Sequence, residues 1–183
     1  MKKFIYVSIV IGGLLFALFE WLRHPLPAIK GTHTISGLSK QVDIYTDKYG
    51  VPHVFAANEQ DLFFAAGYIA ARDRLFQLSL VSLAVRGGLS SVLGPEYLEK
   101  DIYFRTWKIH ETAKKLVENM DARNKIIFED FCKGINFRID EVYNDPPLEF
   151  KLLGFKPSHW DPSIVAGYAR TVSYTHLTLP TKA

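Results

Sequence analysis

One long apolar stretch constrains the fold of this chain more than any other feature. It reads LFFAAGYIAARDRLFQLSLVSLAV and lies between Asn58, a suitable helix N-cap, and the glycine pair Gly87-Gly88. We expect a helix of nearly thirty residues, roughly 40 Å long if it is straight. Because apolar residues cover almost every side and small residues allow close backbone approach, the pattern predicts a central helix inside the protein.

A charged triplet, Arg72-Asp73-Arg74, interrupts this predicted helix. Unpaired charge inside a protein is costly, so we expect the triplet to form ion pairs. Direct catalysis is the alternative, but no nearby Ser, Cys or His completes an arrangement of nucleophile and base. Asp61, three residues after Asn58, stands where the acid of a capping box would.

Shorter elements surround the long helix. Residues 42–46 alternate between apolar and polar side chains and are followed by the turn Lys48-Tyr49-Gly50 and the extended residues 51–56, which predicts a β-hairpin. Residues 95–120 predict an amphipathic helix, and a third helix begins at Asp121 and ends before residues 144–147. Asp161 caps a last helix, whose pattern stops within a few residues of Arg170. The pattern favours a helix-rich α+β domain over residues 41–171.

Charge and cysteine content exclude several classes of function. The stretch from His24 to Thr171 carries equal numbers of acidic and basic residues, so we expect no nucleic-acid partner. Cys132 is the single cysteine; no internal disulfide is possible, and we expect a small core side chain without a reactive role. None of the six histidines pairs with another at metal-ligand spacing on one helix face.

The first 23 residues predict an export signal. Lys2 and Lys3 precede an apolar run over residues 4–19, and Trp21 and Arg23 follow it. Three interpretations stay open: an uncleaved anchor that contacts the membrane through residues 4–22, a removed signal peptide, or an ordinary core helix. Residues 24–40 form a linker with two prolines and two glycines. We expect the domain outside the cytoplasm, either periplasmic or membrane-anchored.

Three segments together resemble a known family. They are VDIYTDKYGVPHVFAANEQDLFFAAGYIAARDRLFQLSL, then GGLSSVLG, then LGFKPSHWDPSIVA. In this order and spacing they resemble the start of the penicillin acylase (penicillin amidase) family over about Val42 to Arg170. The residues that carry this structural motif are Tyr49, Gly50, Pro52, His53, Asp73, Arg74, Gln77, Gly94 and Trp160.

Three serines depart from the family pattern. Where many members carry an acid, an Arg and a Glu, this chain has Ser79, Ser82 and Ser91. Loss of a single charge would leave its partner unpaired, so joint loss is favoured electrostatically. We therefore predict that the three positions form one cluster.

The resemblance implies an N-terminal-nucleophile hydrolase with an αββα core, of which this chain is an incomplete, helix-rich portion. Family members are exported precursors that cut themselves into a small α chain and a large β chain. The serine that begins the β chain attacks an amide carbonyl, and its own α-amine, with a pKa of about 8, acts as base. The present chain resembles the first part of the α chain, so no catalytic, substrate-binding or metal-binding residue is predicted in it. The calcium that many members bind would use residues beyond Arg170.

The last residues, VSYTHLTLPTKA, do not resemble the family. Val172 to Thr181 are the translation of a transposon-end adapter that is used in preparing sequencing libraries. We therefore interpret residues 172–183 as an artefact and expect the native protein to continue. A native, β-prone C-terminus is the alternative.

Two functions of different classes follow. The first is a fragment of an exported acylase, inactive by itself, whose parent uses the missing β chain as partner and a small acylated amide as substrate: a β-lactam, an acyl-homoserine lactone or another amide. The second is a complete, membrane-anchored helical binding module without enzymatic activity.

Overall fold

The computed structural model describes residues 2–23, 31–32 and 34–177. Its helices are α1 (Lys2–Arg23), α2 (Glu59–Arg86), α3 (Ser90–Leu93), α4 (Leu98–Thr106), α5 (Ile109–Glu118), α6 (Ala122–Val142), α7 (Leu148–Leu153) and α8 (Pro162–Leu177), with a 3-10 turn, η1 (Pro95–Tyr97). The strands β1 (Asp43–Thr46) and β2 (Pro52–Phe55) form one antiparallel pair, in which Ile44 lies opposite Val54. The predicted helix-rich α+β class is confirmed.

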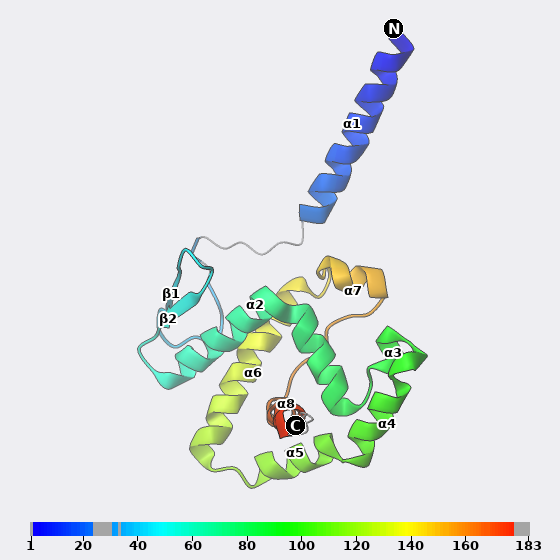
Figure 1. Ribbon diagram of the computed structural model, residues 1–183. Coiled ribbons are helices and arrows are strands. Elements are labelled where there is room, and N and C mark those ends of the chain that lie inside the picture. The colour runs from blue at the N-terminus through cyan, green and yellow to red at the C-terminus, as the bar shows by residue number, and fades with distance from the viewer. Residues whose placement is uncertain (1, 24–30, 33, 178–183) are drawn as a thin grey trace, which may run out of the picture.

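Helix α2 is the central element, as predicted. It packs against α4, α5, α6, α8 and β2 (Figure 1). Asn58 caps it by accepting a hydrogen bond from the backbone N–H of Asp61, and Gly87 ends it in the left-handed region. The helix is kinked at Arg74, whose backbone angles are not helical.

Two glycines let α2 and α6 cross with their backbones in contact. A Cβ atom added to Gly67 would lie 2.0 Å from the carbonyl oxygen of Phe131, and one added to Gly134 would lie 1.9 Å from that of Phe64. No larger residue fits either position without moving a helix apart. The crossing therefore fixes the relative placement of the two longest helices of the domain.

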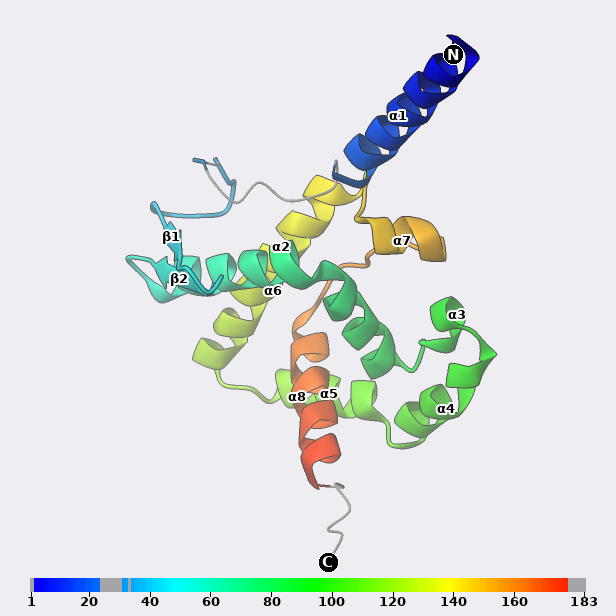
Figure 2. The ribbon, with the colours of Figure 1, turned by 45° about the horizontal axis from the view of Figure 1, so that its top comes forward.

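The main core lies where α2, α5, α6, α7 and α8 meet. Its most buried side chains include Ile135, Ile139, Phe150 and Ile164. Helix α8 packs across α5, as Figure 2 shows. Cys132 is buried in this core, as predicted. Burial raises the pKa of its thiol to about 12, so the thiol stays protonated and unreactive at neutral pH.

The single helix predicted over residues 95–120 is wrong. The chain forms η1, α4 and α5 there, and it turns between α4 and α5 at Lys108, which adopts φ 51°. This turn lets Ile109 and Ala113 face α8 and become buried. Tertiary packing thus overrides a continuous helical pattern.

The last helix also extends further than its pattern predicts. Helix α8 continues past Arg170 to Leu177. β-branched residues such as Thr171 and Val172 lower helix propensity by only about 0.5 kcal/mol each, which a helix already started by buried residues tolerates. Residues 178–183 of the predicted artefact lie outside the described part of the chain.

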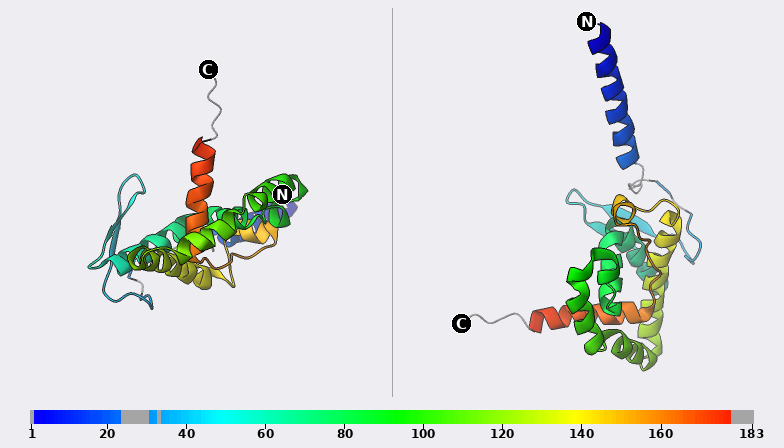
Figure 3. Two further views of the ribbon diagram at one scale, coloured as in Figure 1. Left: turned by 90° about the horizontal axis from the view of Figure 1, so that it is seen from below. Right: turned by 90° about the vertical axis from the view of Figure 1, so that its right-hand side faces the viewer.

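Helix α1 stands apart from the other helices, and α8 projects from the domain (Figure 3). Apolar side chains such as Ile9, Leu14 and Phe16 are more than half exposed on α1. Among the residues that the structure describes, no helix combines the length and the apolar character needed to cross a membrane. Contact with a membrane through residues 4–22 stays a prediction.

Candidate functional site

Four motif residues lie in the turn between β1 and β2 and at the start of β2: Tyr49, Gly50, Pro52 and His53. Asp47 organises the turn, since its Oδ1 accepts hydrogen bonds from the backbone N–H groups of Tyr49 and Val51 at 2.8 and 3.0 Å. Its Oδ2 lies 3.3 Å from His53 Nε2. The hydrogen bond from Val51 and the contact with His53 lower the pKa of Asp47. Gly50 adopts φ +82°, which a larger residue rarely does. These residues hold the hairpin together.

Three further motif residues lie at the kink of α2. Arg72 donates two hydrogen bonds to Asp73, from Nε to Oδ1 at 2.7 Å and from Nη2 to Oδ2 at 3.1 Å. The predicted pairing is thus observed for Arg72 and Asp73. Asp73, Arg74 and Gln77 are exposed, so the expectation that this whole segment lies inside the protein is wrong at the kink.

Gly94 ends α3 with φ +103°. The start of α3 is held by a buried carboxyl group that the sequence does not single out. Asp101 accepts hydrogen bonds from the backbone N–H groups of Leu89 and Ser90, both at 2.8 Å, and from Ser90 Oγ at 2.6 Å. Burial raises the pKa of Asp101, but these hydrogen bonds lower it more, and the net pKa falls. Asp101 therefore ties α4 to the start of α3.

Trp160 is buried beside an unpredicted partner, Asn136 of α6. The backbone N–H of Trp160 donates to Asn136 Oδ1 at 2.7 Å, and Asn136 Nδ2 donates to the Trp160 carbonyl at 2.9 Å. One side-chain amide thus satisfies both backbone groups of Trp160, immediately before α8 begins.

No hydrogen bond joins Ser79, Ser82 and Ser91 to one another among the described residues. Ser79 and Ser82 are buried on one side of α2, and neither hydroxyl has a hydrogen-bond partner among the described residues. Ser91 is exposed on α3 and donates to the Gly88 carbonyl at 2.6 Å. Two of the serines that replace the family's charged residues are therefore buried, and the third is exposed.

One contact joins a serine to a histidine in the described part of the chain. His110 Nε2 lies 3.1 Å from Ser163 Oγ, but the Ser163 hydroxyl donates to Asp161, so His110 must act as donor and not as base. Ser163 is also buried at the start of α8, with 4% of its surface exposed. This arrangement caps a helix and lacks the geometry of an activated nucleophile.

The four motif groups do not converge. Across residues 34–177, no hydrogen bond or ion pair connects the hairpin turn, the α2 kink, Gly94 and Trp160 to one another. Within the same described region, no three His, Cys, Asp or Glu side chains gather to hold a metal ion. Each motif group stabilises local structure.

Comparison with known proteins identifies the scaffold. The family model described as penicillin amidase matches residues 41–180. The chain belongs to the penicillin amidase family. The match begins at the predicted start of the domain and continues to residue 180, past the boundary predicted at residue 171.

Relatives with different named substrates share this part of the penicillin amidase family. The penicillin acylase 2 proenzyme of a Pseudomonas species is 33% identical over 78% of this chain and 18% of its own length. The acyl-homoserine lactone acylase QuiP of Pseudomonas aeruginosa is 31% identical over 75% of this chain and 16% of its own length. This chain therefore spans less than a fifth of these relatives.

A solved structure shares the arrangement of helices. The thermostable penicillin G acylase from Alcaligenes faecalis matches with a TM-score of 0.67 and 27% identity, over 78% of this chain and 76% of that chain. The predicted resemblance to the penicillin amidase family is confirmed in both sequence and fold.

Proposed function

We propose that this chain is the N-terminal portion of an exported acylase precursor, whose parent hydrolyses a linear amide. One observation carries the proposal: acylases match about three quarters of this chain, but the match covers only 16–18% of their own length. The remaining length is ample for a catalytic β chain that begins with the nucleophilic serine. That β chain would be the partner of the α-chain portion described here.

The local geometry supports the proposal that the chemistry lies elsewhere. The carboxyl groups of Asp47, Asp61 and Asp101 all accept backbone hydrogen bonds, so they serve the fold. An N-terminal nucleophile needs a free α-amine beside its hydroxyl, and no internal serine of this chain meets that condition. We therefore expect the 183-residue chain to be inactive.

Three classes of acyl donor fit this reaction: a β-lactam, an acyl-homoserine lactone or another amide. The penicillin acylase and the acyl-homoserine lactone acylase are 33% and 31% identical to this chain, a difference too small to choose between their substrates. The shared chemistry is hydrolysis of an amide that bears an apolar acyl group. Calcium binding, if the parent shares it, would use residues outside those described.

Export is the second part of the proposal. Lys2 and Lys3 precede the apolar residues of α1, the order found in secretory signals. The domain would then lie in the periplasm or outside the cytoplasmic membrane. The alternative of a complete membrane-anchored binding module is not favoured, because the chain belongs to a family of hydrolases.

An activity assay tests the proposal. The purified 183-residue chain and the product of the recovered full gene would each be given a chromogenic phenylacetyl amide and a long-chain acyl amide. We expect release of the chromophore by the full-length product and none above the buffer blank by the 183-residue chain. Turnover by the 183-residue chain would overturn the assignment of the nucleophile to a missing segment.

A further inference from the structure

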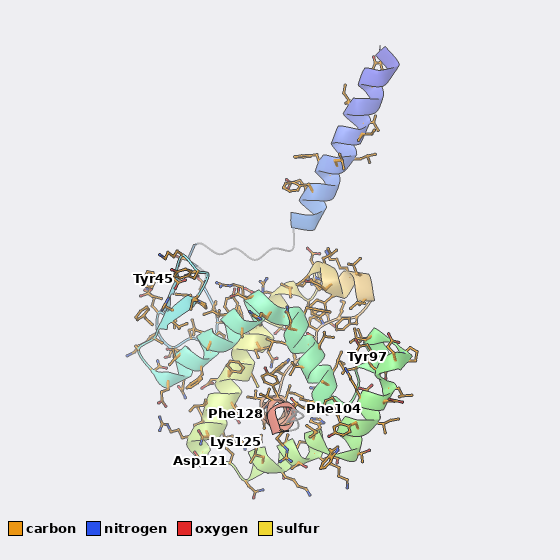
Figure 4. The ribbon with its side chains drawn as sticks, in the orientation of Figure 1. Tyr45, Tyr97, Phe104, Asp121, Lys125 and Phe128 are labelled. Atoms are coloured by element: carbon orange, nitrogen blue, oxygen red, sulfur yellow. The ribbon has the colours of Figure 1, made fainter. Side chains whose placement is uncertain are left out.

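The hairpin of β1 and β2 has two edges that no further strand covers among the described residues. It lies at the periphery of the domain, where Figure 4 labels Tyr45. All four residues of β1 are exposed, whereas Pro52 and Val54 of β2 are partly covered and β2 packs against α2. β1 is therefore the outer strand of the hairpin.

The register of the hairpin determines which backbone groups point out of its edges. The Asp47 N–H donates to the Val51 carbonyl oxygen at 3.0 Å, so the backbone groups of this pair point inward. Inward and outward positions alternate along an antiparallel pair. In the observed register, the backbone groups of Tyr45 therefore face β2, and the N–H and C=O groups of Ile44 and Thr46 point out of the free edge of β1.

The two edges differ in their ability to pair with another strand. Pro52 and Val54 occupy the outward positions of β2. Pro52 has no N–H group, so a strand added at the β2 edge would lack one hydrogen bond of the ladder. β1 contains neither proline nor lysine, two residues that commonly protect an edge from pairing, and its one charged residue is Asp43. The β1 edge is therefore the better acceptor of a further strand.

One face of the hairpin carries exposed aromatic side chains. Tyr45 and Phe55 lie edge to face, with their ring centroids 5.8 Å apart, and both rings are more than half exposed. A strand beside β1 would place a side chain next to Tyr45 and cover part of this apolar surface. A third strand would also stabilise a hairpin that is marginal by itself.

We propose that a strand from the part of the precursor outside this chain pairs with the free edge of β1 and extends the hairpin to three strands. This pairing presupposes the proposed function, because the added strand belongs to the rest of the same precursor. The outward N–H and C=O groups of Ile44 and Thr46 form the new ladder, and the aromatic face of the hairpin becomes partly covered.

Two observations favour this occupant over a second copy of the chain. The family match begins at residue 41 and so includes the hairpin, and the matched relatives have more than four fifths of their length outside the matched segment. A strand in the same precursor is also linked to the hairpin when it is made, so its effective concentration, on the order of millimolar, exceeds that of a second copy.

Amide hydrogen exchange, read by mass spectrometry at the level of single residues, tests this pairing. The 183-residue chain and the full-length product of the recovered gene would be compared at submicromolar concentration. In the 183-residue chain, the amides of Ile44 and Thr46 should exchange nearly as fast as in an unstructured peptide. In the full-length product, they should exchange at least about 100-fold more slowly, because each donates to the added strand. Val54, at the opposite edge, should exchange at similar rates in both.

Thr46→Pro removes one of the two outward N–H groups. This group makes no hydrogen bond inside the hairpin, so the 183-residue variant should keep its circular dichroism spectrum. In the full-length product, Thr46→Pro should speed the exchange of the Ile44 amide about tenfold or more. Thr46→Val is the matched control: it keeps the N–H group and a β-branched side chain, so the exchange of Ile44 should change less than about twofold.

Four results would each overturn this pairing. They are fast exchange of Ile44 and Thr46 in the folded full-length product, slow exchange of Val54 in their place, unchanged exchange of Ile44 in full-length Thr46→Pro, and slow exchange that appears only as the protein concentration rises. The last result would identify a second copy as the partner. If full-length Thr46→Pro does not fold, the exchange of the wild-type amides still decides.

The activity assay separates this pairing from the proposed function. An active full-length product in which Ile44 and Thr46 exchange fast would contradict the strand pairing alone. An inactive product in which both amides exchange slowly would contradict the proposed reaction and support the pairing.

Discussion

Asp61 shows how a single buried carboxyl group can hold a connecting segment in place. It accepts hydrogen bonds from the backbone N–H groups of Ser39 and Lys40 at 2.8 and 3.0 Å, and from Ser39 Oγ at 2.7 Å. Burial raises the pKa of Asp61, but these hydrogen bonds outweigh it and lower the pKa to about 2. The expected capping-box acid therefore attaches residues 39–40 to the start of α2.

This contact should be sensitive to acid. Because the folded-state pKa lies below the ordinary aspartate value of 3.8, the contact stabilises the fold above about pH 4 and is lost as the pH falls toward 2. We expect pepsin cleavage near Ser39 to accelerate between pH 4 and pH 2, before circular dichroism shows loss of helix. Asp61→Asn should be cleaved rapidly already at pH 4, whereas Asp43→Asn, at an exposed site, should behave as wild type. Equal wild-type cleavage at both pH values would contradict this role.

At the scale of elements, the sequence predicts the helices and turns that are determined by residues close together along the chain. The hairpin, α2 and α6 were predictable because turn residues, caps and apolar periodicity lie within each segment. The break at Lys108 was not, because it depends on the packing of α5 against α8. Asp101 and Asn136 were missed for the same reason: their partners lie 11 to 24 residues away, and nothing local marks them.

The close crossing of α2 and α6 predicts that a larger residue at Gly134 lowers the free energy of unfolding. In an isolated helix, Gly134→Ala would be stabilising by up to about 1 kcal/mol. Here the new methyl group meets the backbone of Phe64, so we expect Gly134→Ala to lower the free energy of unfolding by roughly 2 kcal/mol. Urea denaturation at low micromolar concentration, followed by circular dichroism, measures the change.

Gly88→Ala is the matched control for this substitution. A Cβ atom added at Gly88 would meet nothing closer than 3.7 Å, so its effect on the free energy of unfolding should stay within about 0.5 kcal/mol. A Gly134→Ala chain as stable as wild type would show that the helices can separate without cost.

At the scale of the whole molecule, large apolar side chains remain exposed at opposite edges. Tyr45 and Phe55 of the hairpin are 63% and 61% exposed, and Trp107 and Leu152 are 59% and 73% exposed. Figure 4 shows Tyr45 on the side of the molecule opposite Tyr97. An isolated two-stranded hairpin with both edges open is also marginal in water. These surfaces suit a chain that packs against further polypeptide.

We therefore expect the segment of residues 24–171 to associate as its concentration rises. Light scattering should increase with concentration, because association buries exposed apolar surface. The full-length precursor should not show this increase under the same conditions. A monomeric, cooperatively melting segment at every concentration would instead support the self-contained binding module.

Two hydrogen bonds between Asn136 and Trp160 hold the residues immediately before α8 against the middle of α6. A side chain in the middle of α6 thus holds the chain in place where the last helix starts. The position of that start is fixed by a contact across the core as well as by the residues that precede it in sequence.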